Sequence, residues 1–507
     1  MSLSTEREES TGRDDLARSG IPGLDDVMRG GFARDRLYLV EGVPGSGKTT
    51  LAMQFLLEGA RHGEPVLYVT LSETANELRS VAASHGWDLE GVHIHELIPS
   101  EDASEDQYTV FHPTEVELGQ TTEMILSEVE RLRPLRVVFD SVSEIRLLAG
   151  SPLRYRRQIL SLKRYFAVRS CTVLLLDDLT GRDRDLQVQS IAHGVLQLDQ
   201  LNPDYGAQRR RINVVKYRGT SYRGGFHDYV IRRGGIDVFP RLVAAEFRGA
   251  AEGKRLPSGI AELDTLLGGG LEPGTSTLIL GAPGTGKSSL AAQFVTNAAA
   301  HGDRGVMFVF DESIQTLTHR ARSLGCDLEP HVARGLVSLQ PIDPAELSPG
   351  EFAHRIRRAV EEDKACVVVI DSLNGYLNAM PTERYLIIQL HELLTYLGQM
   401  GVATLLTSAH RGLIGTQMEA PVDATYLADS AVLLRFFESA GAVRQAISIV
   451  KKRGGPHERT IREFRLEDGR IAVGEPLTRF HGVLTGMPLY EGEESRLMER
   501  ELRHEPS

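Results

Sequence analysis

Two glycine-rich segments of the chain have the spacing of loops that bind phosphate groups. Residues 42–49 read GVPGSGKT and residues 281–288 read GAPGTGKS. Glycines let backbone N–H groups curl around phosphate oxygens, and the positive end of a following helix adds to the attraction. The lysine of each loop is expected to reach the β- and γ-phosphates. We therefore predict two ATP sites, with the ligands Gly42, Gly45, Ser46, Gly47, Lys48, Thr49, Thr50, Gly281, Gly284, Thr285, Gly286, Lys287, Ser288 and Ser289.

Each predicted phosphate loop has a matching aspartate at the end of an apolar run. Residues 137–141 read VVFDS, and residues 367–372 read VVVIDS. An aspartate in that place holds Mg²⁺ through its water shell, and the hydroxyl after the loop lysine ligates the ion. The simpler alternative is an acidic residue in an ordinary turn. We predict Mg²⁺ sites formed by Thr49, Asp140, Ser288 and Asp371.

A third acidic element follows another apolar run in each half of the chain. Glu73 stands after residues 66–69, and Asp311 and Glu312 stand after the equivalent run of the second half. A carboxylate in this place can orient or deprotonate an attacking water. The alternative is an acidic first turn of a helix capped by Thr74 or Ser313, and the two roles are compatible. We predict that Glu73 and Glu312 are catalytic, with Asp311 beside the second.

The chain repeats itself, which indicates a duplicated domain. The segment SGIPGLD at 19–25 returns as SGIAELD at 258–264. Three separate motifs share one offset of 239 residues (258 − 19, 281 − 42 and 312 − 73). Near residues 246–257 glycine, alanine and charge replace the strand pattern. We predict a disordered tail at 1–15, domains at 16–247 and 248–490, and a charged tail at 491–507.

Within each half, short apolar runs alternate with helical stretches. This alternation predicts an α/β fold in which helices cover a mainly parallel sheet. Two later segments read as hairpin strands added to that sheet. In the first half the expected strands are 37–40, 66–69, 137–139 and 172–176, the expected helix is 49–60, and the hairpin segments are 211–216 and 227–231.

Composition narrows the class of protein. The 507 residues contain no apolar run long enough to span a membrane, and the polar N-terminus does not read as a signal peptide. Three distant cysteines, Cys171, Cys326 and Cys366, suit neither a zinc site nor a disulfide framework. These features suggest a cytoplasmic protein. The net charge of −12 makes nucleic acid an unlikely partner.

These motifs together resemble the KaiC family, the double-domain RecA-like ATPases named for the cyanobacterial clock protein. The resemblance runs from about Leu16 to Tyr490 and includes the lead-in segments, the phosphate loops, the acids and the strands that end in Asp-Ser. Two late motifs, KYRGTS at 216–221 and KKRGG at 451–455, also match, as does FHGVLTGMP at 480–488. The resemblance implies two tandem RecA-like P-loop NTPase domains with mainly parallel sheets flanked by helices.

The resemblance also implies how subunits act on one another. In the family the late Lys-x-Arg motif reaches the γ-phosphate bound by a neighbouring subunit. Lys216 and Arg218, and likewise Lys451 and Arg453, are therefore expected to act in trans within a hexameric ring. The alternative is a solvated basic strand edge. KaiB-like or two-component signalling proteins are the partners that the family suggests.

The second domain of the clock protein phosphorylates itself on neighbouring serine and threonine residues. Alignment through the segment DSAVLL at 429–434 brings Thr425 and Tyr426 to those positions. Thr425 retains a hydroxyl nucleophile, whereas Tyr426 replaces the second with a phenol. The first domain also departs from the family, because Ser72 precedes Glu73 where paired acids are common. Self-phosphorylation is one interpretation, and simple packing at a subunit interface is the other.

The leading hypothesis is a KaiC-like ATPase and serine/threonine autokinase that acts as a signalling or timing switch. The alternative is a RecA- or DnaB-like DNA-dependent ATPase. The acidic balance, the lack of a four-cysteine zinc module and the lack of a basic stretch with interleaved aromatic residues oppose that alternative. A third hypothesis is a nucleotide-dependent scaffold with negligible turnover, which Glu73 and Glu312 oppose.

Overall fold

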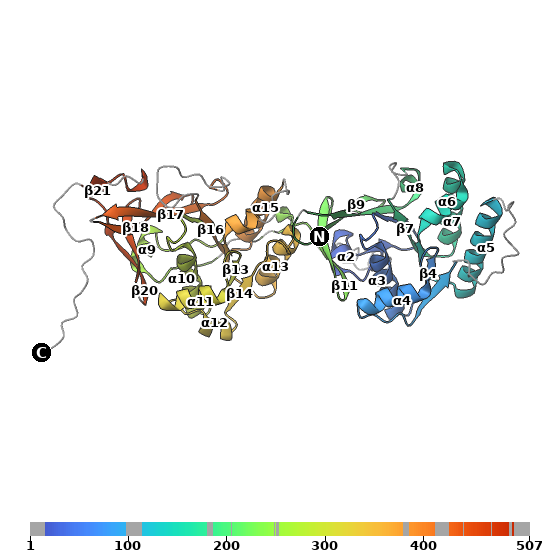
Figure 1. Ribbon diagram of the computed structural model, residues 1–507, viewed down its shortest axis with the longest axis horizontal. Coiled ribbons are helices and arrows are strands. Elements are labelled where there is room, and N and C mark those ends of the chain that lie inside the picture. The colour runs from blue at the N-terminus through green and yellow to red at the C-terminus, as the bar shows by residue number, and fades with distance from the viewer. Residues whose placement is uncertain are drawn as a thin grey trace, which may run out of the picture. The chain divides into compact units, whose positions relative to one another are not determined.

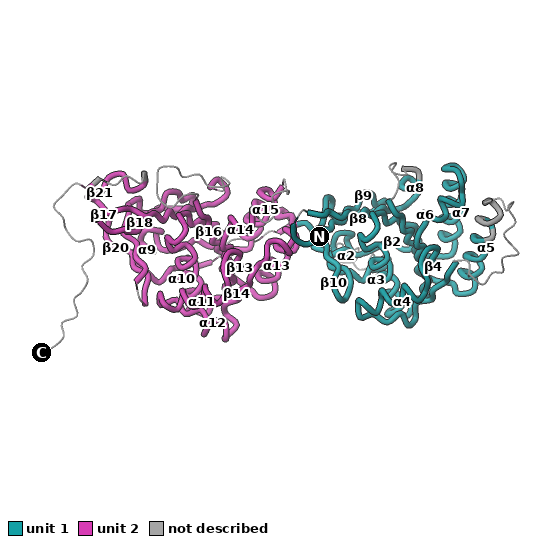
Figure 2. The backbone as a smooth tube through the Cα atoms, viewed as in Figure 1, with its two compact units in different colours: residues 1–241 teal, residues 242–507 magenta. Residues whose placement is uncertain are grey.

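The computed structural model describes residues 16–97, 114–179, 186–203, 205–247, 249, 253–378, 385–410, 425–439, 441–467, 469–485 and 489–490. The predicted tails at 1–15 and 491–507 lie outside these residues. The chain divides into two compact units, residues 1–241 and 242–507 (Figure 2). No helix within the described ranges is both long and apolar enough to cross a membrane.

The first unit is built on a nine-stranded sheet with the order β11-β10-β9-β8-β3-β7-β6-β4-β5. Figure 1 labels β11, β9, β7 and β4 of this sheet. Strands β8 to β5 in this order run parallel, whereas β9, β10 and β11 are antiparallel additions. The predicted parallel sheet with an appended hairpin is therefore confirmed. The strands are β3 (Leu37–Gly42), β4 (Val66–Thr70), β5 (Val92–Glu96), β6 (Arg136–Asp140), β7 (Thr172–Asp178), β8 (Gly194–Leu201), β9 (Arg209–Tyr217), β10 (Phe226–Arg232) and β11 (Gly235–Phe239).

Helices cover both faces of this sheet because its central strands are apolar on both sides. Along β3, Tyr38 and Val40 enter one core and Leu37 and Leu39 enter the other. The first core also contains side chains from α2 (Pro22–Val27), α3 (Lys48–Arg61) and α4 (Ala75–Ser84). The short strands β1 (Leu16–Ala17) and β2 (Phe32–Ala33) pack against it. The second core contains side chains from α5 (Thr114–Leu132), α6 (Val142–Ala149), α7 (Pro152–Val168) and α8 (Leu186–Ile191).

The second unit repeats the plan with the strand order β14-β13-β15-β16-β12-β17-β18-β19-β20. Its strands are β12 (Ser276–Gly281), β13 (Gly305–Val309), β14 (Val337–Pro341), β15 (Val367–Asp371), β16 (Ala403–Ala409), β17 (Ser430–Ser439), β18 (Ala442–Lys452), β19 (Ile461–Glu467) and β20 (Arg470–Pro476), with a small pair β21 (Phe480–His481) and β22 (Leu489–Tyr490). One face carries α9 (Ala261–Leu266), α10 (Lys287–Ala300) and α11 (Ile314–Ser323), and α12 (Glu329–Ala333) lies against α10 and β14. The other carries α13 (Pro349–Glu361), α14 (Leu373–Asn378) and α15 (Leu386–Gln399).

The segment that joins the sheets packs on the second unit. A short 3₁₀ helix, Ala244–Glu246, contacts α15, and Phe247 stacks edge-on against Tyr396. The sequence placed these residues at the end of the first domain. Their apolar side chains instead join the second unit's core.

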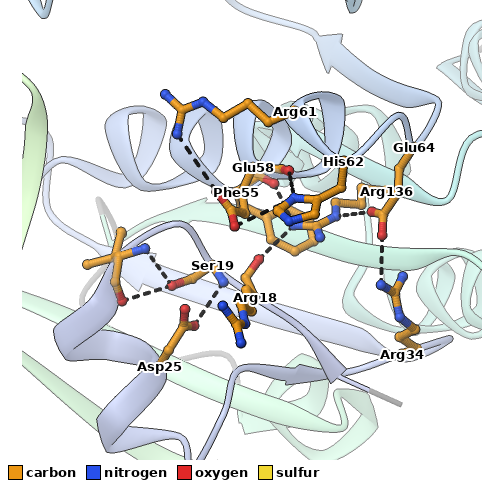
Figure 3. Close-up of polar contacts among 11 residues, drawn as sticks. Arg18, Ser19, Asp25, Arg34, Phe55, Glu58, Arg61, His62, Glu64 and Arg136 are labelled. Carbon is orange, nitrogen blue, oxygen red and sulfur yellow. Dashed lines mark hydrogen bonds and ion pairs between the residues drawn. The ribbon is translucent and has the colours of Figure 1, made fainter. Parts of the chain in front are cut away.

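A buried arginine ties three segments of the first unit together (Figure 3). Arg136, at the start of β6, is only 2% exposed and donates to the carbonyl oxygens of Arg18 (2.7 Å) and Phe55 (2.8 Å) and to Glu64. Glu64 also accepts from Arg34 at 2.7 Å. Burial alone would raise the pKa of Glu64, but the hydrogen bonds from the two arginines lower it below its ordinary value.

We expect Glu64→Ala to lower the free energy of unfolding of the first unit by about 3–5 kcal/mol, because it leaves the buried charge of Arg136 without its carboxylate. Glu64→Gln keeps an acceptor oxygen and should cost less. Urea unfolding followed by fluorescence measures the loss. Trp87 is the single tryptophan of the chain and packs on the first unit's core, so it reports on this unit alone.

The matched control is Arg61→Ala. Arg61 is 64% exposed and lies 3.8 Å from Glu58, so this surface pair should contribute at most about 1 kcal/mol. Equal losses in Glu64→Ala and Arg61→Ala would contradict the role assigned to the buried pair.

Candidate functional site

The carboxyl ends of the parallel strands bring the predicted site residues of the first unit to one edge. Strand β3 leads into the phosphate loop, β6 ends at Asp140, and β4 ends three residues before Glu73. The register pairs Gly42 with Asp178 and Thr70 with Asp140. Segments that are distant in sequence therefore meet at this edge, where ligands bind in open α/β sheets.

The phosphate loop of the first unit has a backbone that only glycine allows. Gly45 and Gly47 have φ angles of 79° and 91°, in the left-handed region. A Cβ on Gly42 would lie 2.4 Å from the Oγ of Ser46. Helix α3 begins at Lys48, directly after the loop, so its N-terminal N–H groups face the place that phosphates would fill.

Lys48 and Thr49 already contact acids at this edge. The Nζ of Lys48 donates to the carbonyl oxygens of Gly42 (2.9 Å) and Val43 (3.2 Å), and it lies 2.6 Å from an oxygen of Asp178. Thr49 donates to Asp140 at 2.9 Å. Asp178 was not predicted from the sequence, because its partner is known only when β3 and β7 are aligned.

Asp140 is buried at the centre of this group. It accepts hydrogen bonds from Thr49 and from Tyr68, a second neighbour that sequence patterns did not predict. Burial raises the pKa of Asp140, although these two hydrogen bonds act in the opposite direction. The hydroxyl of Thr49 and this carboxylate are the oxygen ligands that Mg²⁺ prefers. Together with the glycine cradle, they fit ATP and its magnesium ion.

Glu73 lies beside Asp140 on the loop between β4 and α4. Its backbone exchanges hydrogen bonds with the hydroxyl of Thr70, at 2.6 and 3.0 Å. Its Oε2 is buried and has no hydrogen-bond partner among the residues that the structure describes. Burial, and then the charges of Asp140 and Glu77, raise the pKa of Glu73. Thr74 and Glu77 form the capping box of the helix, so Glu73 takes no part in the cap.

The second unit places its phosphate loop in the same way. A Cβ on Gly281 would lie 2.6 Å from the Oγ1 of Thr285, and α10 begins at Lys287. The Nζ of Lys287 donates to the carbonyl oxygens of Gly281 (3.0 Å) and Ala282 (2.9 Å). Burial lowers the pKa of Lys287. Among the described residues, no acid forms an ion pair with this lysine as Asp178 does with Lys48, and Ala409 holds the matching place in the register.

The acids of the second unit have partners of their own. Burial raises the pKa of Asp371, while hydrogen bonds from Thr407 and Ser288 act in the opposite direction. Asp311 accepts a hydrogen bond from Ser372. Glu312 accepts two hydrogen bonds from the guanidinium of Arg320, both at 2.6 Å. The sequence predicted these acids, but it did not predict Thr407 or Arg320.

The late Lys-x-Arg motif of the first unit contacts backbone carbonyl groups of its own chain. Lys216 donates to Gln189 (2.6 Å) and Ala192 (2.7 Å), and Arg218 donates to Ser190 (2.9 Å). Burial and the charge of Arg218 lower the pKa of Lys216. Within one chain the motif therefore holds the end of α8.

The same motif of the second unit holds the residues aligned with the phosphosite. Lys451 donates to the carbonyl oxygens of Thr425 and Ala428, both at 2.6 Å, and Arg453 donates to that of Tyr426 at 2.8 Å. Thr425 is half-buried, whereas Tyr426 is 54% exposed. The sequence predicted both the motif and the candidate acceptor, but it did not predict that they contact each other within one chain.

Comparison with known proteins gives a consistent result. A family model described as "ATPase: KaiC" matches residues 17–243 and again residues 256–478. A "Circadian clock protein KaiC3" from Synechocystis sp. is 28% identical over 95% of this chain and 96% of its own length. The "Circadian clock oscillator protein KaiC" is 29% identical in Picosynechococcus sp. (93% and 92% covered) and in Synechococcus elongatus (93% and 91% covered). With two matches that span most of the sequence, the chain belongs to the KaiC family of ATPases.

Proposed function

We propose that this protein is an ATP-hydrolysing ring whose second domain also phosphorylates its own chain, so that the ring works as a signalling or timing switch. The names of the relatives, which are circadian clock proteins, support the timing role. KaiB-like or two-component proteins that distinguish the phosphorylated state are its proposed partners, and the cytoplasm is its proposed location.

Hydrolysis in the first domain rests on Lys48 and Glu73. Lys48 would exchange its contact with Asp178 for the β- and γ-phosphates, where positive charge stabilises the transition state. Glu73 would orient the attacking water and accept its proton through the Oε2 that has no hydrogen-bond partner in the described part of the chain. Mg²⁺, held by Thr49 and Asp140, would neutralise charge on the phosphate oxygens.

The position of Thr425 is the observation that carries the autokinase proposal. In the register, Thr277 of β12 pairs with Ser430 of β17, and Gly281 pairs with Leu434. The phosphate loop follows Gly281, whereas Thr425 precedes Ser430. Ser430 and Leu434 are four residues apart along β17, which is about 13 Å at about 3.3 Å per residue. Thr425 therefore lies at the opposite edge from its own ATP site, and we infer that a neighbouring copy supplies the phosphate.

The cations lie at the acceptor's edge as well. Lys451 and Arg453 hold the loop of Thr425 and would reach the neighbour's γ-phosphate together with it. The Oγ of Thr425 would form a bond to the γ-phosphorus as the bond to the ADP oxygen breaks, and the hydroxyl proton would pass to the neighbour's Asp311. Tyr426 is the weaker acceptor, because its rigid ring holds the oxygen elsewhere.

Mixing two inactive variants tests both the ring and the acceptor. Lys287→Ala lacks the donor site and Thr425→Ala lacks the acceptor, so neither should gain phosphate when incubated alone with Mg-ATP. The mixture should gain phosphate on the Lys287→Ala chains, because those chains retain Thr425 and their neighbours retain the ATP site. Mass spectrometry of the peptide that contains Thr425, with a mass label on one variant, measures the result.

Two results would contradict the proposal. Phosphate on Lys287→Ala chains incubated alone would show that the second domain's ATP is not the donor. If neither the mixture nor the unmodified protein gained phosphate, the autokinase proposal would be wrong and only the ATPase proposal would stand.

A further inference from the structure

The two proposed catalytic glutamates differ in whether an arginine pairs with them. In the second domain, Arg320 of α11 donates to both oxygens of Glu312, at 2.6 Å each. In the first domain, Val81 of α4 stands at the corresponding position, with the same offset of 239 residues (320 − 81). Val81 packs on the first core, and the Oε2 of Glu73 has no hydrogen-bond partner in the described ranges.

The two helices have matching lengths and positions, so the contact with Arg320 arises from the side chain and not from a difference in the fold. Helices α4 and α11 are both ten residues long and both begin after a hydroxyl cap, Thr74 or Ser313. Leu78 and Leu317 are fully buried at matching positions. The side chains of Arg320 and Val81 therefore start from comparable places relative to the glutamate before each helix.

The pair between Arg320 and Glu312 is of the strong type. The two hydrogen bonds are charge-assisted and bidentate, and the side chains are 35% and 19% exposed. Water therefore screens this pair less than it screens a fully exposed one. A carboxylate that accepts two such hydrogen bonds has less capacity to orient a water molecule or to take its proton.

We propose that Arg320 is a positioning residue that restrains Glu312 and suppresses ATP hydrolysis in the second domain, so that its ATP is kept for transfer to protein. This inference rests on the proposed function. In hydrolysis, the water oxygen bonds to the γ-phosphorus, the bond to the ADP oxygen breaks with its electron pair, and the water proton passes to Glu312. Asp311 accepts its hydrogen bond from Ser372 and not from Arg320, so it can still take the proton of the acceptor hydroxyl.

The test compares second-domain variants in a Glu73→Gln background, in which the first domain is silenced. Arg320→Val installs the residue of the first domain and should raise phosphate release about tenfold, while the phosphorylated fraction of the chain falls. Arg320→Lys keeps the charge but not the bidentate geometry and should give a smaller rise. The control is Arg322→Val on the same helix. Arg322 pairs with Glu329 and Asp327, so release should not change.

The reciprocal change tests the same idea in the first domain. Val81→Arg, in a Glu312→Gln background, should pair with Glu73 and lower phosphate release about tenfold without lowering the number of nucleotides bound. Unchanged or lower release in Arg320→Val would overturn the inference, whatever the phosphorylation result. If no variant gains phosphate on the chain but Arg320→Val still raises phosphate release, the autokinase proposal is wrong and the proposed restraint on Glu312 is supported.

Discussion

Replacing Glu73 by glutamine should lower phosphate release from the first domain by about 10²–10⁴-fold and leave nucleotide binding intact. Glutamine keeps the shape of the side chain but cannot take a proton from water. The expected loss is large because the Oε2 of Glu73 is buried and has no competing partner among the described residues. Phosphate release at saturating ATP, measured in a Glu312→Gln background, isolates the effect.

Glu90→Gln is the matched control for this prediction. Glu90 is exposed and lies just before β5, at the edge of the sheet opposite the phosphate loop. Its release rate in the Glu312→Gln background should equal that of the background alone. Full phosphate release in the Glu73→Gln/Glu312→Gln double variant would show that neither glutamate takes part in hydrolysis.

Lys48→Ala and Lys287→Ala should each remove one of the two bound nucleotides, which is half of the total at saturation. Each lysine follows a glycine cradle and brings the main positive charge of its site. Equilibrium dialysis with labelled ATP counts the nucleotides bound per chain. The double variant should bind none.

An exposed lysine provides the control for the binding experiment. Lys254 lies on the surface, outside both loops, and Lys254→Ala should bind two nucleotides. Binding of two nucleotides by Lys48→Ala or by Lys287→Ala would mean that the affected loop does not hold ATP through its lysine.

Sequence patterns predicted the features that depend on local spacing. The phosphate loops need glycines at fixed steps before a lysine, and Asp140 and Asp371 close apolar runs of strand length, which form β6 and β15. The repeated offset then predicted two units of one fold, which the two nine-stranded sheets confirm. These features could be predicted because each lies within a short stretch of chain.

Contacts between distant strands and helices could not be predicted in the same way. The pairing of Lys48 with Asp178 depends on the register of β3 and β7. Tyr68 reaches Asp140 only because β4 and β6 are neighbours. No spacing rule links Glu312 to an arginine eight residues later, because the bend into α11 brings the two together. The predicted roles of Lys216 and Lys451 in trans remain predictions, and within one chain both bind backbone carbonyl groups.

The most direct test of this account is incubation of the unmodified protein with Mg-ATP labelled at the γ-phosphate, with free phosphate and phosphoprotein measured separately. We expect label in both fractions, with the protein-bound label on the peptide that contains Thr425. Lys287→Ala, which removes the donor site, should abolish the protein-bound label, whereas Glu312→Gln should retain it because the hydroxyl proton passes to Asp311. Label in neither fraction would contradict the ATPase, and label in free phosphate alone would contradict the transfer to the chain.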